Sequence, residues 1–258
     1  MSAVLQPHPA SPTPAGLWRA SELSPQTLRT CATGHAALDA VLPGGGWPVG
    51  ALVEVLQAPH SLNEWGLLAP LLSRCAGVQV LVGAPHPPFG PALAGRGVDP
   101  QRLLWVQGSQ PDLQLWATEQ ALRCADVELV LAWLPGIRMA QARRLAVAAQ
   151  AHQKLLFVFR AAQAQSESSP AVLRLLLEQG PGGTRSLRLH ILKRRGPPLP
   201  QAVHIEAGPA RLDALLSASR ARRRRAAGAG AMPAASSVEA ALAAGESHAL
   251  DRIASLAA

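Results

Sequence analysis

Short apolar segments alternate with longer helical segments along this sequence, and this alternation constrains the fold more than any other feature. Five short apolar runs are typical of buried strands and lie at 51–56, 78–82, 103–106, 127–133 and 155–159. Helices are expected between them at 62–75, 88–96, 112–124 and 138–152. This order predicts an α/β fold with a mostly parallel central sheet flanked by helices. The segments 187–192 and 202–206 predict antiparallel strands at one edge.

Composition divides the chain into four parts. Residues 1–15 are rich in Pro, Ala and Ser and are expected to be a disordered lead, whereas 16–207 have the pattern of a globular α/β domain. Residues 208–225 form a basic segment that is expected to be helical. Residues 226–258 form a linker and a short amphipathic segment. We therefore expect one folded domain with a flexible C-terminal tail.

Several classes of protein are excluded by the composition. The three cysteines, Cys31, Cys75 and Cys124, lie far apart without a C-x-x-C pair, which argues against a disulfide framework or a zinc site. The eight histidines form no H-x-x-x-H pair, so no metal is expected. No uncharged apolar run reaches the ~20 residues that span a bilayer, and 1–15 lack the apolar core of a signal peptide. The sequence predicts a cytoplasmic protein with no membrane partner.

The positive charge of the chain is concentrated near its C-terminal end. The formal net charge is +8, and residues 211–225 hold six Arg and one Asp. Three interpretations of this segment stay open: weak contact with DNA phosphates, docking of a partner protein, and a solvated helix at the end of the domain. The candidate residues are Arg220, Arg222, Arg223, Arg224 and Arg225.

The segment after the strand at 51–56 lies where a phosphate-binding loop would lie. Such a loop needs glycines for its backbone N–H groups, a Lys for the terminal phosphates and a Ser or Thr for Mg²⁺. Residues 57–65 contain neither Gly nor Lys, and a carboxylate at Glu64 would repel a phosphate. The sequence therefore indicates a vestigial loop without a cofactor. The residues that identify this vestigial loop are Gln57, Pro59, Asn63 and Glu64.

Several short motifs stand in the order in which RecA recombinases carry them. T-G-x-x-x-L-D occupies 33–39 and G-G-x-P-x-G occupies 45–50. The shorter matches are G-V-D at 97–99, L-L at 103–104, Q-P-D at 110–112 and E-Q-A-L at 119–122. Residues 30–206 therefore resemble the ATPase core of the RecA family, which implies a RecA-like fold.

The residues that carry ATPase chemistry in that family are replaced here. The resemblance puts Asn63 and Glu64 at the places of the Walker A Lys and Thr, and Pro85 at the place of the catalytic Glu. Residues 131–133 stand where the Walker B Asp should end the fourth strand, and Arg160 stands near the place of the phosphate-sensing Gln. Without these groups, neither charge neutralisation nor activation of water can be arranged. We expect a RecA-like protein that is not an enzyme.

Longer sequence segments at 44–56, 102–106, 113–122 and 130–135 resemble the ImuA family of translesion-synthesis accessory proteins. That resemblance implies a non-catalytic scaffold, induced in the SOS response, that binds an ImuB-type Y-family polymerase homologue. RecA and the associated error-prone polymerase subunit are further implied partners. Two alternatives stay open: a SulA-like inhibitor of cell division that binds FtsZ, and an active RecA-type DNA-dependent ATPase.

Three further features have competing interpretations. RecA proteins carry basic residues that face the neighbouring subunit's nucleotide where this chain has Lys193, Arg194 and Arg195, so a basic hairpin edge competes with contact to DNA or a partner. The loop 161–170 stands where RecA has a DNA-binding loop, but it contains no cation. The third feature is the set of tryptophan residues, whose rings are expected in or near the core. Trp65 and Trp133 are expected to fill the pocket that holds the nucleotide in a RecA fold. Trp47, Trp105 and Trp116 complete the set expected in or near the core.

Overall fold

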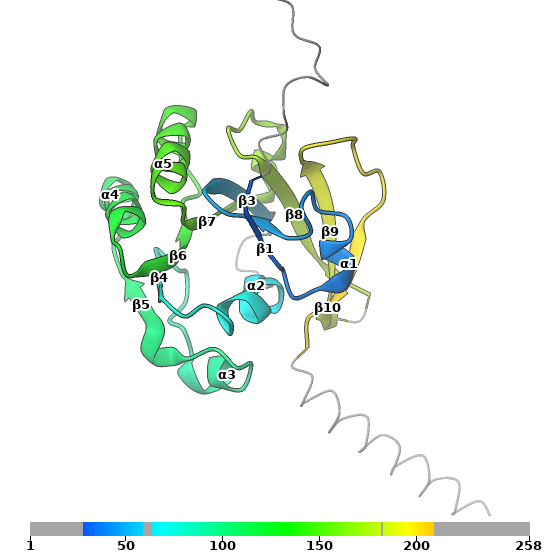
Figure 1. Ribbon diagram of the computed structural model, residues 1–258, viewed down its shortest axis with the longest axis horizontal. Helices are drawn as coiled ribbons and strands as arrows, with labels where there is room; N and C mark the ends of the chain where they lie inside the picture. The colour runs from blue at the N-terminus through cyan, green and yellow to red at the C-terminus, as the bar shows by residue number, and fades with distance from the viewer. Residues whose placement is uncertain (1–27, 59–62, 182, 209–258) are drawn as a thin grey trace, which may run out of the picture. The chain divides into compact units, whose positions relative to one another are not determined.

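The structure is a computed structural model that describes residues 28–58, 63–181 and 183–208 (Figure 1). The chain divides into two compact units, 1–208 and 209–258, and every described residue belongs to the first. The expectations for the lead at 1–15, for Pro59, for the arginines from Arg220 to Arg225 and for the tail lie outside the described residues.

The described residues form an eight-stranded mixed sheet, which confirms the α/β expectation. The strand order is β10-β9-β8-β3-β7-β6-β4-β5; the pairs from β8 to β5 are parallel, whereas β9 is antiparallel to both β8 and β10. The strands are β3 (Ala51–Gln57), β4 (Val78–Val82), β5 (Leu103–Val106), β6 (Val127–Trp133), β7 (Leu155–Ala161), β8 (Leu173–Gly180), β9 (Gly183–Lys193) and β10 (Val203–Glu206). The five strands expected from apolar runs and the antiparallel edge are therefore present.

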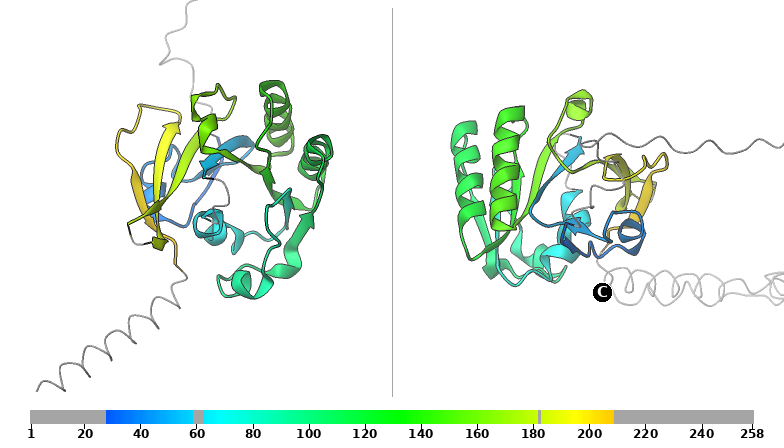
Figure 2. Two further views of the ribbon diagram at one scale, coloured as in Figure 1. Left: turned by 180° about the vertical axis from the view of Figure 1, so that it is seen from behind. Right: turned by 45° about the horizontal axis from the view of Figure 1, so that its top comes forward.

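Helices cover both faces of this sheet. One face packs against α4 and α5, which lie side by side in Figure 2, and the other packs against α2. A strand sends alternate residues to opposite faces, so Leu52 joins the α4–α5 cluster while Val53 and Val55 join the α2 cluster. The helices are α1 (Ala36–Asp39), α2 (Glu64–Leu72), α3 (Gly90–Ala94), α4 (Pro111–Arg123), α5 (Met139–His152) and the 3₁₀ turns η1 (Pro100–Arg102) and η2 (Ala162–Ser166).

A small two-stranded antiparallel sheet precedes the main sheet. It pairs β1 (Thr30–Cys31) with β2 (Trp47–Pro48), and a Cβ atom at Gly46 would lie 2.3 Å from the Cys31 carbonyl oxygen. This small sheet therefore requires glycine at the close approach. Trp47 packs edge-to-face on Phe157, with ring centroids 5.1 Å apart, and connects the small sheet to the centre of the main sheet.

Strand β8 is the strand of the eight-stranded sheet that the sequence does not predict. Its first five residues, 173–177, are apolar except for Arg174, and so short an apolar run has no period that separates a strand from a helix. The strand lies between β3 and β9, and its Arg174 is directly opposite Glu54 of β3. The charged residue is therefore compatible with the sheet interior only because a neighbouring strand supplies the opposite charge.

The expectation that Trp116 lies in or near the core is wrong. Trp116 is 60% exposed, whereas Leu115, Thr118 and Leu122 form the buried side of α4. Residue 116 follows Leu115 by about 100° around the helix, which turns its side chain away from the sheet.

None of the helices in the described part of the chain has the length and apolar character needed to cross a membrane.

Candidate functional site

The carboxyl ends of β3, β4, β6 and β7 meet at one edge of the sheet, because these strands are parallel. In open α/β sheets the ligand crevice lies at this edge. A cavity of about 750 Å³ is lined there by Gln57, Trp133, Arg160 and neighbouring residues, and we call it the Trp133 cavity. A second cavity of about 790 Å³, the Trp65 cavity, is lined by Asn63, Trp65, His86, Phe89 and Arg96, among others. Trp65 and Trp133 each line one of these two cavities, and Ala58 lines both.

Three of the four residues of the vestigial loop meet where β3 ends and α2 begins. Gln57 is the last residue of β3, Asn63 precedes α2, and Glu64 is its first residue. Asn63 is half-buried, and its carbonyl oxygen accepts a hydrogen bond from the Leu67 N–H group at 3.2 Å. The described members of the loop therefore lie at the junction of β3 and α2.

Glu64 is a buried carboxyl group at the N-terminal end of α2. Its residue is 1% exposed, and Gln57 Nε2 donates a hydrogen bond to Glu64 Oε2 at 3.2 Å. Burial raises the pKa of Glu64 from 4.5 to about 7, because desolvation disfavours the charged form. Gln57 Oε1 is buried without a hydrogen-bond partner among the described residues. A protonated Glu64 can donate to that oxygen, which would give an acid–amide pair with two hydrogen bonds.

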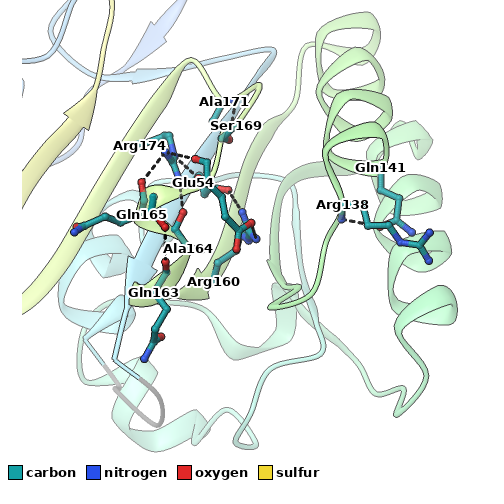
Figure 3. Close-up of polar contacts among 12 residues, drawn as sticks. Glu54, Arg138, Gln141, Arg160, Gln163, Ala164, Gln165, Ser169, Ala171 and Arg174 are labelled. Atoms are coloured by element: carbon teal, nitrogen blue, oxygen red, sulfur yellow. Dashed lines mark hydrogen bonds and ion pairs between the residues drawn. The ribbon is translucent and has the colours of Figure 1, made fainter.

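A second buried group of charges lies on β3, β7 and β8, and sequence reasoning missed it (Figure 3). Glu54 is 2% exposed; its carboxylate accepts a hydrogen bond from Arg160 Nη1 at 3.1 Å and another from Arg174 Nε. Arg160 Nη2 also contacts Glu167 Oε2 at 2.6 Å. Burial alone would lower the pKa of the Arg160 guanidinium. Its hydrogen bonds to Glu167 and Glu54 outweigh that effect, so the pKa is raised overall.

The same charges hold the loop 162–170 against the sheet. Arg174 Nη2 donates to the Ala164 carbonyl oxygen at 2.9 Å, and Arg174 Nη1 donates to the Glu167 carbonyl oxygen at 3.0 Å. Figure 3 shows these contacts converging from the loop onto Arg174 beside Glu54. The signal in the sequence is a charged residue inside each of three apolar strands.

The basic run at the end of β9 lies at the opposite edge of the sheet. Lys193 pairs with Arg174 near the start of β8, whereas Leu177 of the same strand pairs with Gln57 at the end of β3. Lys193 Nζ donates to the Ser169 carbonyl oxygen at 3.0 Å, and Arg194 bonds the carbonyl oxygens of Pro197 and Val41. Arg195 is exposed beside them. The structure therefore separates Lys193, Arg194 and Arg195 from the vestigial loop.

No group of three or more His, Cys, Asp or Glu side chains within the described ranges could hold a metal ion. Where the resemblance to RecA expects the Walker B Asp, β6 ends on the buried residues Ala132 and Trp133, and Trp133 stacks on Phe159 with ring centroids 4.6 Å apart. Arg160 is occupied by Glu54 and Glu167.

Comparison with known proteins points to RecA. No model of a protein family matches the chain. It is 34% identical over 118 residues to protein RecA of Prochlorococcus marinus (strain MIT 9211), and 32% identical over 118 residues to protein RecA of Synechococcus sp. (strain WH7803). These alignments cover 45% of this chain and 32% and 30% of the two relatives, so the chain spans about a third of the length of the relatives that it matches. With the sheet described above, this similarity shows a RecA-like α/β fold.

Proposed function

We propose that this chain is a non-catalytic accessory protein of an SOS-induced translesion DNA synthesis complex that binds an ImuB-type polymerase homologue. The similarity to RecA proteins supports a role in DNA repair. The observation that carries the non-catalytic part is Glu64, a buried carboxyl group at the start of α2. The N-terminus of a helix at this point of the fold is where phosphates bind.

Either form of Glu64 disfavours a bound triphosphate. The ionised carboxylate repels phosphate, and the protonated form is engaged by Gln57 in the interior. Asn63 brings no positive charge, and Arg160 is already neutralised by two carboxylates. A nucleotide at this edge would therefore lack the electrostatic stabilisation that phosphoryl transfer requires.

Titration of the full chain with Mg²⁺–ATP is expected to give no saturable change in tryptophan fluorescence up to millimolar nucleotide. Trp65 and Trp133 line the two cavities at this edge and would report a bound ligand. A RecA protein serves as the positive control under the same conditions. DNA-stimulated hydrolysis of ATP by the purified chain would revive the ATPase alternative and contradict the proposal.

Binding of the polymerase homologue is expected to require residues beyond 210. A chain that ends there keeps the first compact unit, 1–208, and loses the basic segment and the amphipathic segment. In pull-down experiments at equal concentrations, the full chain should retain the polymerase homologue and the shortened chain should not. Equal retention would assign partner binding to the first unit, and loss of DNA binding alone would assign the arginines to phosphate contact.

A further inference from the structure

Helices α4 and α5 leave large apolar side chains uncovered on the side away from the sheet. Leu113 and Trp116 of α4 are 53% and 60% exposed, and Val147 of α5 is 64% exposed. Leu113 and Trp116 are three residues apart and therefore share one face of the helix. Figure 2 shows α4 and α5 side by side with no other described element over them. Exposed apolar residues that gather on one side of a molecule, rather than being scattered singly, are typical of an interaction site.

A fourth exposed apolar residue lies on the edge strand, on the same side of the sheet as α4 and α5. Leu104 lies on β5, the edge strand, and is exposed. Val106, two residues later, packs on the α4–α5 cluster, so Leu104 points to the same side of the sheet. Four of the six most exposed large apolar residues in the described ranges are thus on this side of the sheet.

Arginines border the apolar residues. Arg144 of α5 reaches Glu119 of α4 at 3.0 Å, and Arg123 contacts the same carboxylate at 2.6 Å. Both guanidinium groups are half-exposed, whereas the Glu119 side chain is nearly buried beneath them. Arg143 is exposed beside Val147, and Asp112 is the exposed carboxylate of the two helices. The outward side of the two helices therefore combines exposed apolar side chains with one more positive than negative charge, because Arg123, Arg143 and Arg144 stand against Asp112 and Glu119.

We propose that the outer face of α4 and α5 is a docking surface for an acidic amphipathic segment of a partner protein. Apolar side chains of that segment would cover Leu113 and Trp116, and its carboxylates would pair with Arg123 and Arg143. A second copy of this chain would bring arginines against arginines, so it is the less complementary occupant. The surface lies in the first compact unit and is distinct from the tail to which the proposed function assigns partner binding.

The test uses a synthetic helical peptide with leucines on one face and glutamates on the others, titrated into the full chain and followed by fluorescence anisotropy. Saturable binding is expected, and Trp116→Ser should weaken it by about tenfold, because a buried aromatic anchor carries much of the energy of such contacts. Arg143→Glu should weaken it less and should reduce its dependence on salt. Leu192→Ser, on β9 and away from this surface, is the matched control and should bind normally.

The proposal is overturned if the peptide does not bind, if Trp116→Ser binds it as well as the native chain, or if a peptide with lysine in place of glutamate binds equally. A dimer of the native chain in sedimentation that Trp116→Ser abolishes would assign the surface to a second copy instead. Thermal melts followed by circular dichroism are the control for folding, and they are expected to show that the exposed substitutions leave the fold intact. None of these readouts depends on the polymerase homologue, so failure here leaves the proposed function standing.

Discussion

Replacing Glu54 by alanine is expected to lower the free energy of unfolding by about 3–5 kcal/mol, because it leaves two buried guanidinium groups without their carboxylate. Arg160 and Arg174 are both buried, and Glu54 lies between them on the central strand β3. Arg174 also fixes the loop 162–170, so the loop should lose its protection from amide hydrogen exchange. Urea denaturation of the native and variant chains measures the change.

Two further variants distinguish the loss of these charge–charge contacts from damage to the packing of the sheet. Glu167→Ala removes an exposed carboxylate from the same group and is expected to cost less than about 1 kcal/mol. Replacement of Glu54, Arg160 and Arg174 together by apolar residues of similar volume should recover most of the stability lost by Glu54→Ala. A loss of stability below about 1 kcal/mol for Glu54→Ala would contradict the stabilising role assigned to the contacts of Glu54 with Arg160 and Arg174.

The sheet could largely be predicted from the sequence, because five of its strands are apolar runs separated by helices. Strand β8 could not, since its apolar run carries no strand period and its place beside β3 is a contact between distant segments. The exposure of Trp116 escaped prediction for another reason. An aromatic residue on a helix is usually buried, and its neighbour Leu115 takes the buried position here.

The candidate site, like the fold, could be predicted from the sequence only in part. Glu64 follows from the position of the vestigial loop in the sequence, but its burial and its contact with Gln57 depend on the packing of α2 against β3. For Glu54, Arg160 and Arg174, the sequence shows one charge in each apolar strand without showing that they meet. The strand order brings β7 and β8 to the two sides of β3, and this long-range order makes three separate charges into one group.

The pH dependence of stability is expected to reveal Glu64. Its pKa is 4.5 in the unfolded chain and about 7 in the folded protein, so the unfolded state gives up this proton first as the pH rises. The contribution of Glu64 is therefore favourable below pH 4.5, falls between pH 4.5 and 7, and stays reduced above pH 7. The difference between the limits is about 3 kcal/mol, since one pKa unit corresponds to about 1.4 kcal/mol.

Glu64→Gln should remove this decline, because the amide has the shape of the protonated acid and no charge to desolvate. Relative to the native chain, the variant is expected to gain about 3 kcal/mol at pH 8 and almost nothing at pH 4.5, as measured by urea denaturation across this range. Glu206→Gln, at an exposed position of β10, is the matched control and should leave the pH profile unchanged. Parallel profiles for Glu64→Gln and the native chain would show that the pKa of the Glu64 carboxyl is the same in the folded and unfolded chains, so that the carboxyl is ionised in the folded protein at neutral pH. In that case the helix terminus would carry a fixed negative charge, and electrostatic repulsion alone would keep phosphate away from it.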